Sequence, residues 1–577
     1  MEKQKSIVVI GGTACGPKAA ARARRLDQKA KITIIEEEEN LSTATCGLPY
    51  YIGGVIKNQS KLIARRPDFF KEQMNIDVLN NTRAVAIDRK AHQVELLSLG
   101  TKTTIRYDKL VLATGGIPAV PNLEGRHLGG IFTLTKLKDA VAIRSLIAPH
   151  DIKKAIIVGA GLIGIEMAEN FIAQGLEVTM IEALDWVLPA MLDFEIAAPV
   201  EKHLRSKGVN LITGQRVAAF EGDNNGWVRK VVTKDTAFES RLVLLSLGVK
   251  PNIKLAQEAG LRIGKLGGVD VNEYLETSDP DVYAGGDCVE NVNLVTRQKM
   301  LAPLGSTANK HGRVIGTNVT GGRETFPGVV GTFVVKIFDF NVARVGLTEA
   351  QAKKAGFDIV TALVPSYEHA TYYPGSKEIL VKLIADKPTG CLLGGQVAGP
   401  GESAKRIDVL ATALSFGATV DDLANLDLSY APPFNSAMDP LHAAANVIRN
   451  KRDGLAKGLS PMAVKEKFDR GEEFILLDVR TLAEWNTRRI EAPQAKFVPI
   501  RELRARLEEL PQGAEIVTFC QSSIRAYNAQ RILEGAGFKD VKFLDGSIAG
   551  WPYEVSGTKP FIYFGRSALP PQTLPGP

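Results

Sequence analysis

Cys46 is the first residue in this sequence whose setting suggests redox chemistry. It lies in the stretch Leu41 to Gly54, which reads Leu-Ser-Thr-Ala-Thr-Cys-Gly-Leu-Pro-Tyr-Tyr-Ile-Gly-Gly, a few residues after the acidic Glu36. Five residues beyond the cysteine, the residue is Tyr51 rather than a second cysteine. Because a single thiol cannot close an internal disulfide, it would exchange electrons as a mixed disulfide or as an oxidised sulfur.

A second cysteine, Cys520, stands where a strand is expected to meet a helix. The run Glu515–Phe519 predicts the strand, and Ile524–Gly535 predicts the helix. Backbone amides in such a loop, above a helix N-terminus, stabilise a thiolate. Cys520 is therefore a second candidate nucleophile.

The composition limits the class of protein. A chain of 577 residues is too long for one core, and three or four domains are expected. The net charge of +7, divided among 71 basic and 64 acidic residues, gives no case for nucleic acid and suits an anionic small ligand equally well. The cysteines have no metal-binding spacing, so we expect no metal site and a reducing, cytoplasmic setting; they are Cys15, Cys46, Cys288, Cys391 and Cys520.

The chain shows no sign of a membrane segment in its sequence. Its N-terminus passes directly into the expected strand Ser6–Ile10, which does not look like a signal peptide. No run of 18 apolar residues occurs, so we expect no transmembrane helix.

A nucleotide-binding unit is expected to position Cys46. The strand Ile7–Ile10 ends at Gly11-Gly-Thr-Ala-Cys-Gly16, and the helix Pro17–Leu26 and the strand Lys31–Ile35 follow. That second strand closes on Glu36, about 20 residues beyond the glycines, as a dinucleotide fold requires. Glycines at Gly11 and Gly16 let the backbone approach a pyrophosphate, and Glu36 can accept from a ribose hydroxyl.

A second and complete copy of this pattern follows. Ala155–Val158 leads into Gly159-Ala-Gly161-Leu-Ile-Gly164, a helix, and the strand Glu177–Ile181, which closes on Glu182. The carboxylate of Glu182 would repel a 2′-phosphate, so the pattern favours NADH over NADPH. Two such units in one chain suggest an FAD domain with an NAD domain inserted into it.

Three further stretches extend the pattern: Tyr107 to Gly116, Tyr283 to Asp287, and Pro303 to Asn309. With them the chain resembles the pyridine nucleotide-disulfide oxidoreductase family over roughly residues 5–445. The resemblance implies that Asp287 holds the ribitol of FAD and that Ala308 lies by the flavin ring. Thr114 and Gly115 then belong to the turn that returns the chain between the two domains.

The Cys46 stretch resembles the single-cysteine branch of that family, which includes coenzyme A-disulfide reductases and persulfide-reducing relatives. Those usually have Asn before the cysteine, where this chain has Thr45. Ser42, Thr45, Lys18 and Arg22 are substrate-binding candidates, the last two because they match basic residues that contact coenzyme A. The resemblance also implies a homodimer in which Tyr430 and Tyr372, or its neighbour Tyr373, reach the cysteine of the other subunit.

The C-terminal part resembles a rhodanese domain. Its marks are Asp478-Val-Arg480, the loop Cys520-Gln-Ser-Ser-Ile-Arg525, and Asp545-Gly-Ser-Ile-Ala-Gly-Trp551. Rhodaneses carry a sulfane sulfur on the cysteine that corresponds to Cys520, and Arg525 is a candidate catalytic residue of the same loop. Many have Gly where this chain has Ser523, and Gly-His-Ile where it has Arg488-Arg489-Ile490.

We therefore expect an α/β protein with two Rossmann-like dinucleotide-binding domains (FAD and NAD), an α+β dimerisation domain and a C-terminal α/β rhodanese-like domain. The expected boundaries are 1–113 and 245–325 for FAD, 114–244 for NAD, 326–445 for dimerisation, 446–462 for a linker, 463–557 for the rhodanese-like domain and 558–577 for a Pro-rich tail.

The leading hypothesis is a flavin-dependent NAD(P)H reductase of coenzyme A disulfide, persulfide or polysulfide, coupled to the sulfur-carrying Cys520. An NADH oxidase or peroxidase that cycles Cys46 through a sulfenic acid is the alternative, although it leaves Cys520 unused. A flavoprotein redox sensor whose rhodanese-like module only binds partners is a third.

Overall fold

The chain divides into two units, which we describe separately. The structure, a computed structural model, describes residues 4–149 and 151–557. The first unit comprises Met1–Asp185 and Arg205–Gly331, and the second comprises Trp186–Leu204 and Thr332–Pro577. The predicted tail, 558–577, lies outside the described residues.

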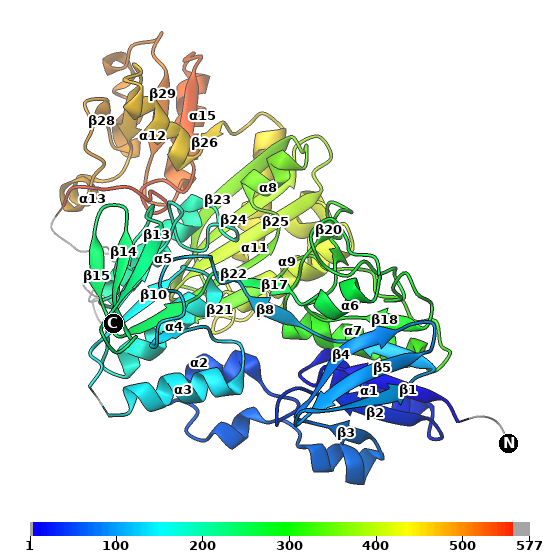
Figure 1. Cartoon of the computed structure of the whole chain (residues 1–577). Coiled ribbons are helices and arrows are strands. Elements are labelled where there is room, and N and C mark those ends of the chain that lie inside the picture. Colours follow the sequence, from blue (N-terminus) through cyan, green and yellow to red (C-terminus); the bar gives the residue numbers. More distant parts are fainter. Residues whose placement is uncertain (1–3, 150, 558–577) are drawn as a thin grey trace, which may run out of the picture. The chain divides into compact units, whose positions relative to one another are not determined.

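The first nucleotide-binding pattern folds into a five-stranded parallel sheet (Figure 1). Its central strands are buried, β-branched runs that are covered on both faces, as parallel strands require. Helix α1 (Cys15–Leu26) packs against α7 (Gly305–Asn318). The strand order is β18 (Val282–Ala284), β7 (Lys109–Leu112), β1 (Ser6–Ile10), β2 (Lys31–Ile35) and β3 (Asp77–Leu79).

The second pattern repeats this arrangement. Its parallel sheet has the order β12 (Asn210–Ile212), β11 (Glu177–Ile181), β10 (Lys154–Val158), β16 (Leu242–Leu245) and β9 (Ile131–Phe132). Helix α4 (Leu162–Ala173) follows β10 as α1 follows β1. The antiparallel pair β8 (Gly116–Pro118) and β17 (Val249–Pro251) connects the two sheets, close to the predicted domain junctions.

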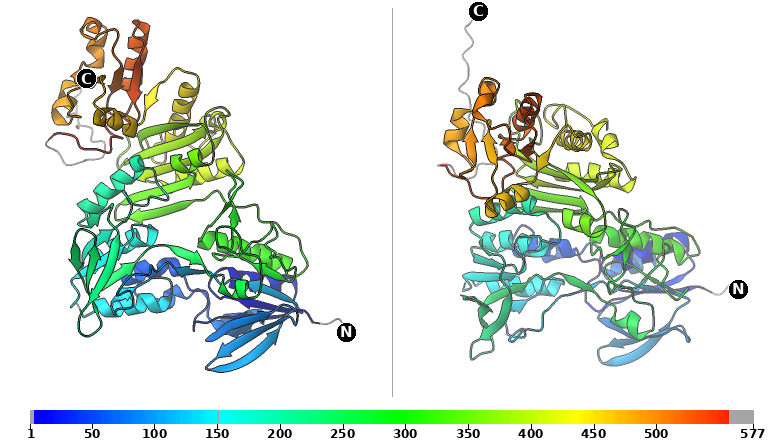
Figure 2. Two further views of the ribbon diagram at one scale, coloured as in Figure 1. Left: turned by 45° about the horizontal axis from the view of Figure 1, so that its top comes forward. Right: turned by 90° about the horizontal axis from the view of Figure 1, so that it is seen from above.

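Smaller elements complete the first unit. One antiparallel sheet contains β4 (Thr82–Asp88), β5 (Gln93–Ser98) and β6 (Thr101–Arg106), drawn in blue in Figure 2. Another contains β13 (Val217–Gly222), β14 (Val228–Thr233) and β15 (Ala237–Glu239). The short helices are α2 (Leu48–Ile52), α3 (Leu137–Ile147) and α6 (Lys254–Glu258), and β19 (Asn291–Val292) pairs with β20 (Lys299–Met300).

An antiparallel sheet forms the predicted dimerisation domain in the second unit. Its order is β21 (Phe333–Ile337), β22 (Phe340–Gly346), β25 (Leu392–Gly399), β24 (Glu378–Asp386) and β23 (Ile359–Tyr367). Its helices are α8 (Glu349–Lys354), α9 (Ala404–Ser415), α10 (Val420–Ala424) and α11 (Pro440–Arg452), and most of α5 (Phe194–Ser206) belongs to the same unit.

A buried lysine ties α5 to this sheet. The Lys382 ammonium lies 3.0 Å from Glu195, 3.3 Å from Asp193 and 2.7 Å from Glu349. Burial alone would lower the pKa of Lys382, but the three carboxylates raise it above its ordinary value. The lysine therefore stays charged and holds the inserted segment in place.

The predicted linker, 446–462, begins later than its composition suggested. Helix α11 continues to Arg452, because Ala444, Ala445 and Ile448 are buried on one face of it. Most polar residues of this stretch lie on the partly exposed face of that helix, whereas Lys451 is largely buried. Only a short connection separates α11 from strand β26 (Gly458–Leu459), and Pro461 occupies the first turn of α12 (Pro461–Asp469), a position that favours proline.

The C-terminal sheet is parallel and five-stranded. Its order is β26, β30 (Val541–Leu544), β29 (Ile516–Phe519), β27 (Ile475–Asp478) and β28 (Ala495–Phe497). The remaining helices are α13 (Leu482–Thr487), α14 (Ile500–Leu503) and α15 (Ile524–Gly535). The helix expected at Ile524–Gly535 has those bounds.

Candidate active sites

The turn that carries Cys46 is tied to the first glycine-rich loop. Ser42 donates its N–H to the Gly12 carbonyl at 2.7 Å. The turn Thr45–Gly47 then places Cys46 at the surface, directly before α2. Ser42 and Thr45, two of the predicted substrate-binding residues, precede the cysteine in this segment. An external sulfur compound can reach a thiol in this position.

Cys46 has no partner thiol in its own chain. All five cysteines are free. Tyr51 is buried, and its ring lies 4.4 Å below the guanidinium carbon of Arg144. This tyrosine is a packing residue, so the chemistry of a cysteine pair is excluded.

Tyr50 is a neighbour of Cys46 that sequence reasoning missed. Its hydroxyl donates to Glu166 of α4 at 3.4 Å. Burial, reinforced by Glu166 and Glu169, raises the pKa of Tyr50 to about 12. Tyr50 is therefore a protonated donor at neutral pH. The only sequence signal was its place in the Cys46 stretch.

The first glycine-rich loop has the shape that a dinucleotide needs. Gly11 has a φ of +108°. A Cβ there would lie 2.1 Å from the Ala113 carbonyl oxygen, and a Cβ at Gly16 would lie 1.9 Å from the Gly11 carbonyl oxygen. Only glycine fits either position. Glu36 accepts from the Gly12 N–H at 2.6 Å, so its carboxylate lies beside the loop.

The second loop repeats this geometry. Gly159 has a φ of +102°, and a Cβ at Gly164 would lie 2.3 Å from the Gly159 carbonyl oxygen. A Cβ at Gly161 would meet only the Ser246 carbonyl oxygen, at 3.8 Å, so the space above the loop is open. Glu182 accepts from the Ala160 N–H at 2.8 Å. The two predicted nucleotide sites thus have matching cradles.

Three of the other predicted flavin-site residues follow β7 or β18, and the fourth, Ala308, lies on α7. Burial raises the pKa of Asp287, which has no hydrogen-bond partner among the described residues. Such a carboxylate suits the hydroxyl groups of a ribitol chain. Thr114 donates to the Asn252 carbonyl at 2.7 Å, and Gly115 follows it with a φ of +69°. Ala308 is buried on α7.

His311, also on α7, was missed by sequence reasoning. It is completely buried, and its Nδ1 accepts from the Gly286 N–H at 3.1 Å, directly before Asp287. Burial lowers its pKa to about 4, so the ring is neutral and can act as this acceptor. The hydrogen bond joins residues that are 25 positions apart, so no local sequence pattern indicates it.

The basic residues of α1 differ in their surroundings. Lys18 is exposed, and Arg22 donates through Nε to Thr317 at 3.1 Å. Arg24, by contrast, is buried and donates to the backbone carbonyls of Met74 and Asn75. Lys18 and Arg22 therefore remain candidates for an anionic ligand, while Arg24 is structural.

Tyr372 and Tyr430 form an exposed pair in the second unit. Their hydroxyl oxygens lie 3.0 Å apart, and the residues are 73% and 49% exposed. This hydrogen bond raises the pKa of Tyr372 above its ordinary value. Tyr373 instead packs edge-on against His369. Of the two neighbouring tyrosines, Tyr372 is the one that meets Tyr430.

Cys520 lies in the loop between β29 and α15 and is 1% exposed. The Ser547 hydroxyl accepts from the N–H groups of Cys520 and Ser523, both at 3.1 Å, and lies 3.7 Å from the Cys520 sulfur. Ser547 was missed as a site residue, because it is 27 positions away. Ser523 has a φ of +73°, which explains why glycine is common there in rhodaneses.

Arg525 lies beside Cys520 and is held by a carboxylate. It donates to both oxygens of Glu484, at 2.8 and 2.7 Å. These hydrogen bonds raise the pKa of Arg525, with a smaller contribution from Cys520. The guanidinium is therefore fixed in orientation at the mouth of the Cys520 loop.

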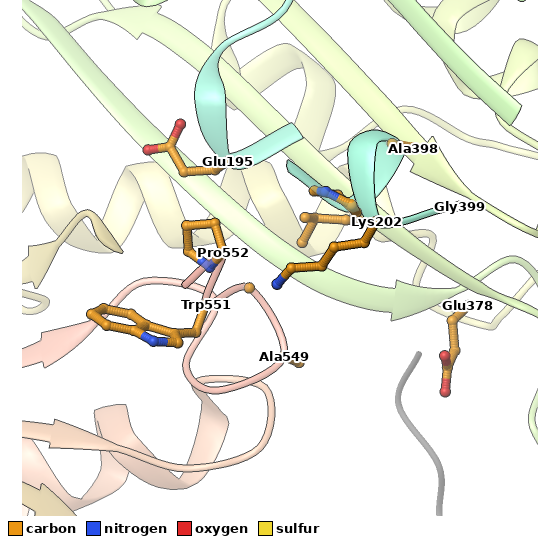
Figure 3. Close-up of a pocket in the computed structure, with 11 residues that line it drawn as sticks. Glu195, Lys202, Glu378, Ala398, Gly399, Ala549, Trp551 and Pro552 are labelled. Carbon is orange, nitrogen blue, oxygen red and sulfur yellow. The ribbon is translucent and has the colours of Figure 1, made fainter. Parts of the chain in front are cut away.

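A small pocket in the second unit contains none of the predicted site residues. Helix α5, strands β24 and β25 and the segment Ala549–Pro552 line it. In Figure 3 the Lys202 side chain extends toward that segment, whereas the Glu378 carboxyl points away from it. Among the described residues no cluster of His, Cys, Asp or Glu could hold a metal ion, and no described helix is long and apolar enough to span a bilayer.

The sequence was compared with known families and structures. Residues 5–306 match the pyridine nucleotide-disulphide oxidoreductase family, 332–442 match its dimerisation domain, and 460–553 match the rhodanese-like domain. These matches confirm the fold class that the sequence predicted.

Two curated proteins and one solved structure illustrate what this chain is similar to. The NAD(P)H coenzyme A polysulfide/persulfide reductase of Pyrococcus horikoshii is 39% identical over 77% of this chain and 99% of its own length. An NADH oxidase of Methanocaldococcus jannaschii is 35% identical over 76% of this chain and 97% of its own. The structure of a NAD-dependent persulfide reductase from A. fulgidus is 45% identical, with a TM-score of 0.90 over 95% of this chain and 100% of that one.

Proposed function

Because the chain belongs to the pyridine nucleotide-disulphide oxidoreductase family and carries a rhodanese-like domain, we propose that it is an FAD-dependent NAD(P)H reductase of coenzyme A disulfide, persulfide or polysulfide. The observation that carries the proposal is the exposed, unpaired Cys46 beside the Gly11 loop. A thiol without an internal partner must form its disulfide with the substrate.

The reaction begins with attack by the Cys46 thiolate on the coenzyme A-bound sulfur of a persulfide. A bond forms between Cys46 and that sulfur, the bond to the outer sulfur breaks, and hydrosulfide leaves. With a disulfide as substrate, coenzyme A thiolate leaves instead. Two-electron reduction of the mixed disulfide then restores the Cys46 thiolate and releases coenzyme A as the thiol.

The nucleotide cradles fit the groups that this chemistry needs. The Gly11 loop, Glu36, Asp287 and Ala308 would hold FAD, and the Gly159 loop and Glu182 would hold NADH. A bound FAD provides the path by which the electrons of NADH reach sulfur. The Glu182 carboxylate supports NADH as the preferred donor.

The tyrosine pair supplies a donor for the leaving group. Only one O–H of the pair is used between Tyr372 and Tyr430, so the other can donate to a departing thiolate. Both residues are exposed, and so are the apolar Phe434 and Met438 of the same unit. We propose that this surface meets a second copy of the chain and that the tyrosines serve the partner's Cys46.

The remaining parts handle the ligand and its sulfur. Lys18 and Arg22 would bind the phosphates of coenzyme A. Cys520 would accept or deliver a sulfane sulfur, with Arg525 at the loop mouth. The unpaired state of all five cysteines supports a reducing, cytoplasmic setting.

Replacing Cys46 tests the proposal directly. Cys46→Ser should lose at least 100-fold of the NADH-dependent sulfide release from coenzyme A persulfide, a rough figure for a lost covalent nucleophile. Cys391→Ser, at a partly exposed cysteine on the other unit, is the matched control and should keep full activity. Unchanged turnover of Cys46→Ser would refute the assignment.

The competing activity is an NADH oxidase or peroxidase, for which the Methanocaldococcus relative is the argument. It predicts faster NADH consumption with oxygen or peroxide than with coenzyme A persulfide. Mass spectrometry of the native protein separates the two chemistries, because the reductase should carry a coenzyme A adduct on Cys46 and the peroxidase a sulfenic acid.

A further inference from the structure

The segment Asp545–Trp551, which we call the Ser547 loop, holds the Cys520 loop in place through hydrogen bonds. Besides the three contacts of its hydroxyl, Ser547 has a left-handed backbone with a φ of +49°. The Ile548 N–H donates to the Cys520 carbonyl and the Ala549 N–H to the Gln521 carbonyl, both at 3.1 Å. The Ser547 loop therefore fixes both the backbone and the sulfur of Cys520.

The same loop is seated on the dimerisation domain. Asp545 forms a buried ion pair with Lys451 of α11, and the Lys451 ammonium also donates to the Thr361 carbonyl of β23 at 2.7 Å. Leu363 of β23 packs against two glycines of the loop. A Cβ at Gly546 or Gly550 would lie 2.8 or 2.9 Å from its Cδ2 atom.

These contacts leave the loop little freedom. Burial raises the pKa of Asp545, and the Lys451 ammonium opposes that rise. Removing the lysine would leave a buried carboxylate without its counter-charge, so the loop would have to move or take up a proton. The Ser547 hydroxyl would move with it, because Asp545 and Ser547 are two residues apart.

We propose that Ser547 is a positioning residue for Cys520, and that the contacts of its loop with Lys451 and Leu363 set its position. Sulfur transfer at Cys520 would then depend on two residues that lie outside the rhodanese-like domain. The inference rests on the proposed role of Cys520 as a sulfur carrier.

The step that Ser547 assists is an exchange of sulfur between two thiolates. The Cys520 thiolate attacks the outer sulfur of a persulfide R–S–S⁻, so that a bond forms between Cys520 and that sulfur, the sulfur–sulfur bond of the persulfide breaks, and R–S⁻ leaves with the electron pair. The Ser547 O–H donates to the thiolate before the attack. Once the sulfur is bound in a disulfide link and holds less charge, the hydroxyl can turn to the Leu544 carbonyl at 3.4 Å.

Ser547→Gly separates positioning from folding. Glycine adopts the left-handed backbone without strain, so the variant should fold, with a melting temperature lowered only because the N–H groups of Cys520 and Ser523 lose their acceptor. If the hydroxyl positions Cys520, persulfide formation on Cys520 from polysulfide should slow about tenfold or more. The pH profile of Cys520 alkylation should also move upward, because the thiolate loses a donor. Wild-type loading and an unmoved profile would overturn the inference.

Lys451→Met and Leu363→Ala test the seating of the loop in the full-length protein. Both should slow Cys520 loading by about tenfold while NADH-dependent reduction of coenzyme A disulfide at Cys46 continues, which shows that the protein is folded. Lys254→Met is the control, because Lys254 is an exposed lysine of the other unit that pairs with Glu258 one helical turn away. Loading of both variants at the wild-type rate would disprove the coupling.

Sulfur loading of wild-type Cys520 distinguishes a failure of its proposed role as carrier from a failure of the Ser547 inference. If wild-type Cys520 takes no sulfur from polysulfide or coenzyme A persulfide, its role as carrier fails, and the inference fails with it. If wild-type Cys520 loads normally and the variants load equally well, only the inference fails.

Discussion

The acids that close the two nucleotide cradles have the same local geometry. Glu36 accepts from the N–H groups of Gly12 and Glu38, at 2.6 and 2.9 Å. Glu182 accepts from those of Ala160 and Leu184, at 2.8 and 2.9 Å. Each carboxylate is therefore fixed in orientation before a nucleotide arrives, which lowers the entropy cost of binding a ribose.

This geometry makes Glu182 a test of cofactor choice. Glu182→Gln keeps an acceptor oxygen and removes the charge, so repulsion of a 2′-phosphate should fall. We expect kcat/KM for NADPH relative to NADH to rise about tenfold, which corresponds to about 1.4 kcal/mol. Steady-state kinetics with both nucleotides measures the ratio. A ratio that stays at the wild-type value would show that the charge of Glu182 does not select the cofactor.

Spacing in the sequence was enough to locate the residues that act through local backbone shape. The glycines, Glu36 and Glu182 follow from one strand–turn–helix pattern that occurs twice. Tyr50, His311 and Ser547 could not be found in this way, because their partners are 116, 25 and 27 positions distant. Contacts of that kind depend on how elements pack. The sequence marked Tyr50 and Ser547 only as members of the Cys46 stretch and of the stretch Asp545–Trp551, without indicating their contacts.

At the level of elements, the pair Arg525–Glu484 joins the N-termini of α15 and α13 beside Cys520. Glu484 also accepts from the N–H and hydroxyl of Thr481, in a capping box. Burial alone would raise the pKa of Glu484, but the hydrogen bonds from Arg525 and Thr481 hold it at about 2. The ionised carboxylate is therefore stabilised by the fold.

The sign of the pH dependence follows from that depressed pKa. The pair contributes stability above the ordinary pKa of 4.5 and loses it as the pH falls toward 2. Glu484→Gln should lower the free energy of unfolding of the rhodanese-like domain by about 2 kcal/mol at pH 6, a value that already allows for partial exposure. The difference from wild type should vanish by pH 2.

Urea titrations between pH 6 and pH 2 can measure this difference. Replacing Trp186 and Trp227 with Phe restricts the fluorescence signal to Trp485 and Trp551, the two tryptophans of the C-terminal domain. Glu508→Gln is the control, because Glu508 is exposed and has no ion pair among the described residues. If Glu484→Gln lowers the free energy of unfolding as much at pH 2 as at pH 6, the stability does not come from the ionised carboxylate.

Elements with a clear period were predicted better than their ends. Strands β2 and β11 and helix α15 have the bounds expected from sequence, because buried branched residues or a clear helical pattern define them. The predicted linker, 446–462, took in the last residues of helix α11, since a polar helix face and a linker have the same composition. The opposite face of α11 is buried, which identifies the stretch as helical rather than as a linker. This burial is apparent only from the fold.

At the scale of the whole molecule, the proposed Cys46 site has two parts, the cysteine and the tyrosine pair. Each chain presents Cys46 on one unit and the pair Tyr372–Tyr430 on the other, both exposed. The chain also matches a dimerisation domain over residues 332–442. A two-fold dimer would form two equivalent sites, each with a cysteine from one subunit and tyrosines from its partner.

Mixed dimers test this arrangement. Cys46→Ser and the double variant Tyr372→Phe/Tyr430→Phe should each be impaired alone, the first in forming the mixed disulfide and the second in protonating the leaving thiolate. Co-expressed in equal amounts with two different tags, they pair at random, so half of the dimers contain both chains. Each such dimer has one site with an intact cysteine and intact tyrosines, while its other site lacks both.

Shared sites therefore predict recovery of about a quarter of the wild-type rate in the mixture, and about half in heterodimers purified through both tags. If each site is instead built within one chain, every site of a mixed dimer carries one lesion and no activity returns. Sulfide release from coenzyme A persulfide is the measurement, with FAD content checked in all samples. Mixing Cys46→Ser with itself under two tags is the control, because it forms the same dimers with no intact cysteine.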